Sequence, residues 1–300
     1  MKGKIVVIGS SNTDMVVQSH HIPKPGETVL GGEFIMNPGG KGANQAVAVA
    51  KLGGDVTFIA RVGEDVFGKE AIKGFQSYGI DTTYTYIDKK TPSGVALIMV
   101  DDHGENCISV ALGANSTMQK EDIDKAENVI RESEFVLIQL EIPIEVVEYS
   151  VRTAAENGVH VVLNPAPAQE LSNDVLASLY MITPNETEAE LLTGIKVEDE
   201  ASARSAAKVF MSKGVDHVVI TMGSQGAYVL SNNIDQLIPC PSVKAVDTTA
   251  AGDTFNGALV VGLAEGMGLK QAVEFANKAA AYSVTIMGAQ ASVPSRENLN

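Results

Sequence analysis

Two glycine-rich segments contain the side chains best suited to chemistry in this sequence. Residues 247–257, Asp-Thr-Thr-Ala-Ala-Gly-Asp-Thr-Phe-Asn-Gly, place small residues before a predicted helix, with Asp253 directly after them. A helix N-terminus offers free backbone N–H groups to an anion such as phosphate. A carboxylate beside that anion is unfavourable unless it has a task, and accepting a hydroxyl proton during phosphoryl transfer is such a task. A helix-capping aspartate is the alternative interpretation.

The second segment, Pro-Gly-Gly-Lys-Gly-Ala-Asn-Gln at 38–45, opens a predicted helix. Its glycines let the backbone approach a ligand closely. Lys41 adds positive charge, and Asn44 can both donate to and accept from a hydroxyl. The segment is not a Walker loop, because Gly42 rather than Ser or Thr follows the lysine, and it is not GxGxxG. An ordinary strand-to-helix turn is the alternative.

Further polar residues follow predicted strands. Asn185 and Glu188 are three residues apart at a helix start, so they share one face. Their oxygens suit a hydrated Mg²⁺, although a solvated acidic helix start would have the same pattern. Residues 10–14, Glu141 and Asn164 end other strands, where ligands bind in open α/β sheets. Loop capping by short polar side chains is the alternative there.

These segments need a scaffold that brings them together. Continuous apolar runs, typical of strands buried on both faces of a parallel sheet, occur at 4–9, 56–63, 135–141, 159–167, 181–186 and 217–226. Helical patterns lie between or after them, at 42–54, 69–80, 145–158, 201–214 and 269–288. This alternation predicts an α/β fold with a doubly wound, mostly parallel sheet flanked by helices.

Two segments without helical pattern, 14–37 and 84–112, interrupt this alternation. Their short strand-like pieces and turns predict a small β-sheet inserted on the main sheet. A flap of this size must cover its apolar face, so we expect a lid that also forms a homodimer contact. Because no long linker or repeat is present, residues 1–300 are expected to form a single α/β domain that carries the lid.

Composition argues against several classes of protein. Lys plus Arg number 22 and Asp plus Glu 37, a net charge of −15 that disfavours nucleic acids and anionic membranes as partners. A hydrophobic share of 45% is that of a globular chain. Two cysteines, and histidines that never pair at helical spacing, argue against a disulfide framework and a zinc site. No apolar run reaches the roughly 20 residues that span a bilayer, so a soluble cytoplasmic protein is expected.

The two glycine-rich segments together resemble the paired signatures of the PfkB-type carbohydrate kinases. GGKGANQA at 39–46 and DTTAAGDTFNG at 247–257 carry the resemblance, and KPGETV, LNPAPA and TPNETEAE extend it from about residue 4 to Pro294. The resemblance implies ATP-dependent phosphorylation of D-ribose to ribose 5-phosphate. It also implies Mg²⁺ and a monovalent cation activator such as K⁺.

The resemblance also implies roles for individual residues. Asp253 would be the general base, beside an anion hole of Ala250, Ala251 and Gly252. The implied sugar contacts are Asn12, Asp14, Gly40, Lys41, Asn44 and Glu141. The implied nucleotide contacts are Asn185, Thr221, Gly223, Ser224, Gly226, Gly252 and Asn277, the last replacing the histidine of some members. Glu188 would hold Mg²⁺ through water, and the implied monovalent cation loops contain Asp247, Thr249, Ser283, Ile286, Gly288 and Ser292.

Three other functions deserve comparison. A related kinase could act on deoxyribose, another sugar such as a ketose, or a nucleoside, although 5% aromatic residues offer little surface for a base. A sugar-binding module without catalysis would not need Asp253 beside a glycine cradle. A nicotinamide dehydrogenase, suggested by the opening strand, lacks its GxGxxG motif.

Overall fold

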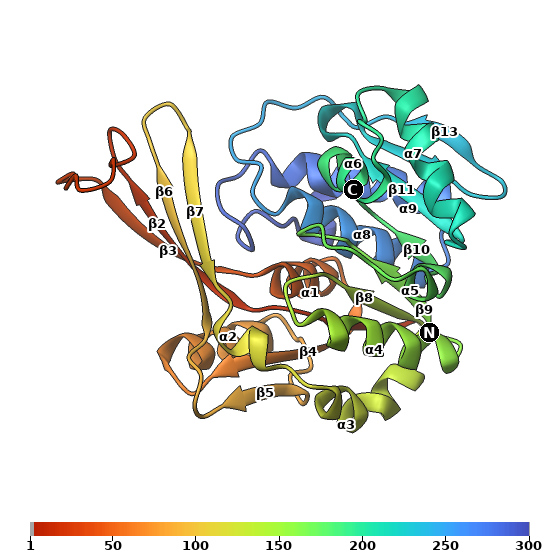
Figure 1. Ribbon diagram of the computed structural model, residues 1–300, viewed down its shortest axis with the longest axis horizontal. Helices are drawn as coiled ribbons and strands as arrows, with labels where there is room; N and C mark the ends of the chain where they lie inside the picture. Colours follow the sequence, from red (N-terminus) through yellow and green to blue (C-terminus); the bar gives the residue numbers. More distant parts are fainter. Residues whose placement is uncertain (1–2, 300) are drawn as a thin grey trace.

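A large sheet forms the centre of the molecule, and the computed structural model describes residues 3–299 around it (Figure 1). Among these residues, its nine strands lie in the order β13 (Asp235–Ile238), β12 (Ala227–Leu230), β11 (His217–Thr221), β10 (Met181–Ile182), β9 (His160–Leu163), β8 (Phe135–Ile138), β1 (Lys4–Ile8), β4 (Asp55–Gly63) and β5 (Thr85–Asp88). Neighbouring strands are parallel, except that β12 runs antiparallel to both β11 and β13.

Both faces of this sheet are buried. In β1, Ile5 and Val7 point into one core cluster and Val6 and Ile8 into the other. One face is covered by α1 (Lys41–Lys51), α2 (Val66–Ser77), α8 (Ala251–Ala264) and α9 (Leu269–Ser283). The other is covered by α3 (Lys120–Arg131), α4 (Ile144–Glu156), α5 (Asn173–Ala177), α6 (Glu186–Thr193) and α7 (Glu200–Ser212). The predicted doubly wound α/β fold is therefore confirmed.

The structure also corrects the predicted elements. Helix α9 ends at Ser283 rather than at 288, where the β-branched residues that follow have low helix propensity. Helix α3 was not predicted, since only Ile123, Ala126 and Ile130 are buried apolar residues among its charged ones. The antiparallel edge strands β12 and β13 were also missed. Within residues 3–299, no helix is long and apolar enough to cross a lipid bilayer.

A second sheet projects from the body (Figure 1). Among the described residues its four strands lie in the order β3 (Glu33–Gly39), β2 (Asn12–Gln18), β6 (Gly94–Val100) and β7 (Asn106–Ala111). The segment 84–112 contributes less to it than predicted. Its first part forms β5, which pairs with β4 at the edge of the large sheet.

The register of the small sheet separates two faces. On the inner face, Asp14, Val16 and Ile98 line a cleft of about 620 Å³, whose other wall includes residues 245–249 and 287–289. On the outer face, Phe34 is 64% and Leu97 53% exposed. Both faces are therefore apolar in part, and only the inner one faces the body.

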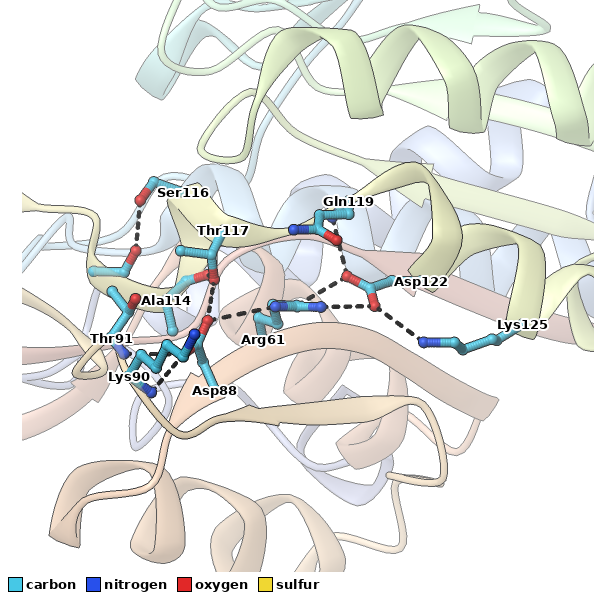
Figure 2. Close-up of polar contacts among 11 residues, drawn as sticks. Arg61, Asp88, Lys90, Thr91, Ala114, Ser116, Thr117, Gln119, Asp122 and Lys125 are labelled. Carbon is cyan, nitrogen blue, oxygen red and sulfur yellow. Dashed lines mark hydrogen bonds and ion pairs between the residues drawn. The ribbon is translucent and has the colours of Figure 1, made fainter.

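An ionic cluster fixes the junction between β4, β5, α3 and the 3₁₀ turn η1 (Gly113–Thr117) (Figure 2). The Arg61 guanidinium donates to both carboxylate oxygens of Asp122 at 2.9 Å and to Asp88 at 3.4 Å. The Thr117 hydroxyl donates to the same Asp88 oxygen at 2.7 Å. The cluster holds η1, which follows β7, against the large sheet.

Candidate active site

Asp253 lies at the start of α8 and is only 6% exposed. Its carboxylate accepts two hydrogen bonds from α1, at 3.0 Å from Asn44 Nδ2 and at 2.9 Å from Gln45 Nε2. Burial raises the pKa of Asp253, whereas the charge of Lys41 and these two hydrogen bonds act against that rise. The packing of α1 on α8 therefore joins the two glycine-rich segments around one buried carboxylate.

Close backbone approach explains the glycines at the start of α1. Gly40 has a φ of 89°, and a Cβ there would lie 2.7 Å from the backbone nitrogen of Asn12. A Cβ on Gly42 would lie 2.6 Å from the backbone nitrogen of Ser10, and one on Gly39 would meet the carboxylate of Asp14 at 2.2 Å. The glycines thus bring the start of α1 against the β1–β2 loop, and the close approach to a ligand that the sequence predicted stays a prediction.

Charged groups converge where these elements meet. Glu141 accepts from the Ser10 hydroxyl at 2.5 Å and from the backbone N–H of Lys41 at 3.0 Å. Burial opposes the charge of Lys41, but four neighbouring carboxylates, led by Asp253 and Glu141, raise its pKa overall. For Asp14, burial and the same two carboxylates raise the pKa to about 6, against the effect of Lys41. One ammonium group therefore faces several acids.

Asn12 is 7% exposed and is held by a residue that the sequence analysis did not identify. Asn115, in η1, donates from its side-chain amide to Asn12 Oδ1 at 2.8 Å and accepts from the Ser11 backbone N–H at 2.9 Å. Asn115 is fully buried, 103 residues away in sequence. It ties η1 to the start of β2 and to Ser11 before it.

The N-terminus of α8 is open to a cavity. No side chain caps this helix, and Ala250 at its N-cap has a φ of 58°, a left-handed conformation that no other non-glycine residue among 3–299 adopts. A Cβ on Gly252 would meet no atom within 4 Å. This cavity has a volume of about 200 Å³. Its lining includes residues from the starts of α1, α6 and α8 and from the end of β11, namely Lys41, Asn185, Glu188, Thr221, Ala250, Ala251, Gly252 and Asp253.

Asn185 and Glu188 form a capping box at the start of α6. Glu188 accepts from the Asn185 backbone N–H at 2.9 Å and from its side-chain amide at 3.0 Å. Burial raises the pKa of Glu188, the Asn185 hydrogen bond and Lys41 lower it, and the net direction is upward. The two residues therefore do form a helix start, which was the alternative to a magnesium site. Both also line the cavity.

The other predicted nucleotide contacts lie beside this cavity or farther away. Thr221 lines it at the end of β11, while Gly223 and Ser224 are exposed in the following turn. Gly226 has a φ of 110°. Asn277 is 3% exposed, and its side-chain amide donates to the carbonyls of Ile238 and Pro239 at 3.0 and 3.3 Å. Its N–H groups hold the chain after β13, so an adenine contact stays a prediction.

The predicted cation loops meet at Asp247. Its carboxylate accepts from the backbone N–H of Thr249 at 2.9 Å and of Gly288 at 2.8 Å. Burial raises the pKa of Asp247, but hydrogen bonding from the Thr249 side chain, with these two backbone N–H groups, outweighs it and lowers the pKa overall. Ser283 and Ser292 are buried and donate to Ala280 and Ala289 carbonyls, and Ile286 is 36% exposed. Among the described residues, no three His, Cys, Asp or Glu side chains cluster as a metal site.

The sequence analysis also missed a set of buried amides. Gln45 Nε2 donates to Asp253 and to Asn164 Oδ1 at 3.0 Å, and its Oε1 accepts from Gln139 Nε2 at 2.5 Å. Asn164 was expected to face the crevice, but its hydrogen-bond partners were not predicted. The available signals were a glutamine adjacent to Asn44 and a glutamine that interrupts the apolar run at 135–141.

Comparisons with known proteins place this geometry in a family. Residues 2–296 match the model of the pfkB family carbohydrate kinases. The chain is 46% identical over 297 residues to the ribokinase of Haemophilus influenzae, covering 99% of this chain and 97% of that protein. It is 38% identical to the deoxyribokinase of Salmonella typhi, with the same coverage. The structure of Arabidopsis thaliana ribokinase complexed with ribose and ATP has a TM-score of 0.93 at 33% identity, covering 100% of this chain and 98% of that one.

Proposed function

The chain belongs to the pfkB family of carbohydrate kinases, and from this premise we propose that it transfers the γ-phosphoryl group of ATP to the 5-hydroxyl of D-ribose. The observation that carries the proposal is the buried Asp253 carboxylate beside the uncapped N-terminus of α8. The similarity to ribokinases, one of them solved with ribose and ATP, supports the choice of substrates.

The sugar would bind where the small sheet meets α1. Asn12, Asp14 and Asn44 offer donors and acceptors to a polyol, with Gly40, Lys41 and Glu141 beside them. Asp14 lines the cleft under the small sheet, and Asp253, whose charge helps to raise the pKa of Asp14, lines the smaller cavity. Several fixed polar partners suit a neutral sugar, whereas an apolar pocket would not.

Asp253 would accept the proton of the 5-hydroxyl as the oxygen attacks the γ-phosphorus, and the bond from that phosphorus to the ADP oxygen would break. Backbone N–H groups of Ala250 and Gly252 would face the negative charge on the transferred group, joined by that of Ala251 if it left the Thr248 carbonyl, to which it donates at 3.2 Å. The open space at Gly252 and the cavity at this helix end fit such a group. Lys41, held positive by its carboxylate neighbours, lines the same cavity.

The nucleotide would lie along the ends of β10 and β11. Asn185, Thr221, Gly223, Ser224 and Gly226 form this edge, with Asn277 behind it. Mg²⁺ would neutralise phosphate charge when bound. Glu188 fits a hydrated ion held through water, because its oxygens already accept hydrogen bonds from Asn185. Use of ATP also fits a cytoplasmic location.

A monovalent cation such as K⁺ would bind between the loops that Asp247 joins. Asp247 has a carboxylate whose pKa is lowered. The surrounding loops, with Thr249, Ser283, Ile286, Gly288 and Ser292, would supply the other ligands, partly as carbonyl oxygens. These donors are of the hard oxygen type that such ions prefer. Because the same loop leads into α8, ion binding would order the anion hole.

The small sheet would act as a lid over the sugar and as a homodimer contact, through its exposed outer face. Phe34, Met36, Leu97 and Met99 are 40–64% exposed on this one face. Sedimentation at micromolar concentration should find a dimer for the wild type and a monomer for Leu97→Glu. Val66→Glu, at a residue 63% exposed on α2, is the matched control and should stay dimeric. A monomeric wild type would contradict the proposal.

A related substrate is the second candidate, because the deoxyribokinase of Salmonella typhi is 38% identical. A coupled ADP-release assay with ribose, deoxyribose, ketoses, hexoses and nucleosides should give the highest kcat/KM for ribose. In the same assay, Asp253→Asn should lower kcat by roughly 10²–10⁴, the size of a general-base contribution, with little change in KM for ATP. Near-normal kcat for this variant would refute the assignment of the base.

A further inference from the structure

The buried amides behind Asp253 have a fixed direction. Asn164 donates from Nδ2 to the backbone carbonyl of Thr183 at 3.0 Å. A carbonyl oxygen cannot donate, so this contact determines which end of the Asn164 amide is nitrogen. Its Oδ1 must then face Gln45, and it accepts from Gln45 Nε2 at 3.0 Å.

The same logic fixes Gln45, which is fully buried. Its Nε2 has two hydrogens, and both are used, one by Asn164 and the other by Asp253 Oδ1 at 2.9 Å. A flipped Gln45 amide would turn its oxygen toward two acceptors. From the opposite side, Gln139 donates to Gln45 Oε1 at 2.5 Å. Two independent contacts therefore hold the Gln45 amide so that it donates to Asp253.

Gln139 donates a hydrogen bond to Gln45 while its own side-chain oxygen accepts none among the described residues. Gln139 is fully buried. A buried acceptor without a partner is unfavourable, so stability alone does not explain a glutamine here. The benefit is the one donor that it supplies to Gln45.

From this directed set we propose that Gln45, oriented by Gln139 and Asn164, is a positioning residue that aims the Asp253 carboxylate at the sugar hydroxyl. The inference rests on the proposed role of Asp253 as base. Gln45 reaches the substrate only through Asp253. Asn44 holds the other carboxylate oxygen, so the two amides together fix the plane of the carboxylate.

The test compares Gln45→Met with Gln45→Glu. Methionine keeps a similar volume and removes the donor, so kcat should fall roughly 10- to 100-fold, the cost of a misplaced reacting group, while KM for ribose and ATP stays within about twofold. Glutamate places a second carboxylate against Asp253 and should lower kcat further at neutral pH. Gln139→Met should have a smaller effect in the same direction.

The pH profile provides a second readout. Loss of the Gln45 donor should shift the acid limb of kcat to higher pH, because the Asp253 carboxylate loses a hydrogen bond. Lys41 from α1, Glu141 after β8, Glu188 from α6 and Asp14 from β2 also act on Asp253, and all are unchanged in this variant. Val151→Ala, on the buried face of α4, controls for lost stability and should leave kcat and the profile unchanged.

The outcomes separate the two claims. Wild-type kcat and pH profile in Gln45→Met, with an inactive Asp253→Asn, would overturn the positioning role and leave the proposed function intact. An active Asp253→Asn would overturn the base itself. A lower kcat with a shifted acid limb in Gln45→Met, but not in Val151→Ala, would support the positioning role.

Discussion

Two buried aspartates show how partners decide what a carboxylate does. Asp122 is 1% exposed in the junction cluster and Asp253 6% exposed at α8. Asp122 receives a two-pronged guanidinium contact from Arg61, a geometry that neutralises its charge and fixes its position (Figure 2). Asp253 receives only neutral amides as hydrogen-bond donors, from Asn44 and Gln45. Amides orient a carboxylate without cancelling its charge, so it stays available to accept a proton.

The difference extends to the regions around the two residues. The junction cluster of Arg61, Asp88 and Asp122 links β4, β5, η1 and α3 through charged hydrogen bonds. The Asp253 region opens to a cavity and contains a left-handed alanine and buried polar atoms without partners, among them Asn44 Oδ1. Burial alone therefore does not identify a reactive carboxylate. A buried carboxylate whose pKa is raised and that lines a cavity, as Asp253 does, is a candidate functional residue.

The largest expected effect is a loss of stability when the junction cluster is disrupted. Arg61→Met removes the guanidinium from Asp122 and Asp88 and leaves Asp122 only the more distant Lys125 ammonium, at 4.0 Å, so the free energy of unfolding should fall by about 3–5 kcal/mol. Below the unfolding transition, kcat should change less than about twofold, since the cluster does not line the cavity. Urea denaturation with steady-state assays measures both. If Arg61→Met lost activity but not stability, the junction cluster would not be a purely structural region, and the contrast with the Asp253 region would be wrong.

The second prediction is a variant that loses activity but keeps its stability. Gly252→Ala adds a methyl group to open space at the helix end, so stability should stay equal or rise by about 0.5–1 kcal/mol. Activity should fall roughly 10- to 100-fold, because the methyl would enter the space proposed for the phosphoryl group. Gly257→Ala in the same helix is the matched control. Its Cβ would lie 2.5 Å from Ala48 Cβ, so this variant should lose about 1–3 kcal/mol of stability instead.

A third prediction concerns Asp14, whose pKa is raised to about 6 by burial and by Glu141 and Asp253. The ionised form is the better acceptor for a sugar hydroxyl, so KM for ribose should rise as the pH falls through about 6. Asp14→Asn should raise KM about tenfold, the value of a charged hydrogen bond, with a smaller change in kcat. It should also abolish this pH dependence. A KM for ribose in the wild type that is constant between pH 5 and 8 would contradict the prediction.

The smallest effect concerns Asp88 in the junction cluster. Hydrogen bonds from the Lys90 backbone, the Thr117 hydroxyl and the Thr91 backbone, helped by Arg61, lower its pKa to about 2. Because the folded pKa lies below the unfolded value of about 3.9, this stabilisation is fully present above that value and is lost as the pH falls through about 2. Unfolding curves of wild type and Asp88→Asn should therefore differ at neutral pH and converge in acid. A constant difference would show that the ionised form is not favoured.

Several features of the fold and the site followed from the sequence because their signals are local. Continuous apolar runs such as KIVVI predict strands buried on both faces, and glycines before a helix predict a close backbone approach. Asp253 stood out because a carboxylate beside a bound phosphate is unfavourable unless it has a task, although a helix-capping aspartate has the same local pattern. Helix α3 has only a few apolar residues among charged ones, and β13 is partly polar, so their patterns are weak, whereas the short apolar strand β12 was missed although its residues are all buried.

The partners of these residues were decided by the tertiary structure. Gln139 and Gln45 are 94 residues apart, Asn115 and Asn12 are 103 apart, and Arg61 and Asp122 are 61 apart. Which side chains meet depends on the order of the strands and the packing of α1 on α8, and no local pattern in the chain encodes that order. The sequence by itself supplied the reactive groups and the elements that carry them. Only the packed fold decided which carboxylate met a guanidinium and which met two amides beside a cavity, because hydrogen bonds depend on distances that exist only after the chain has folded.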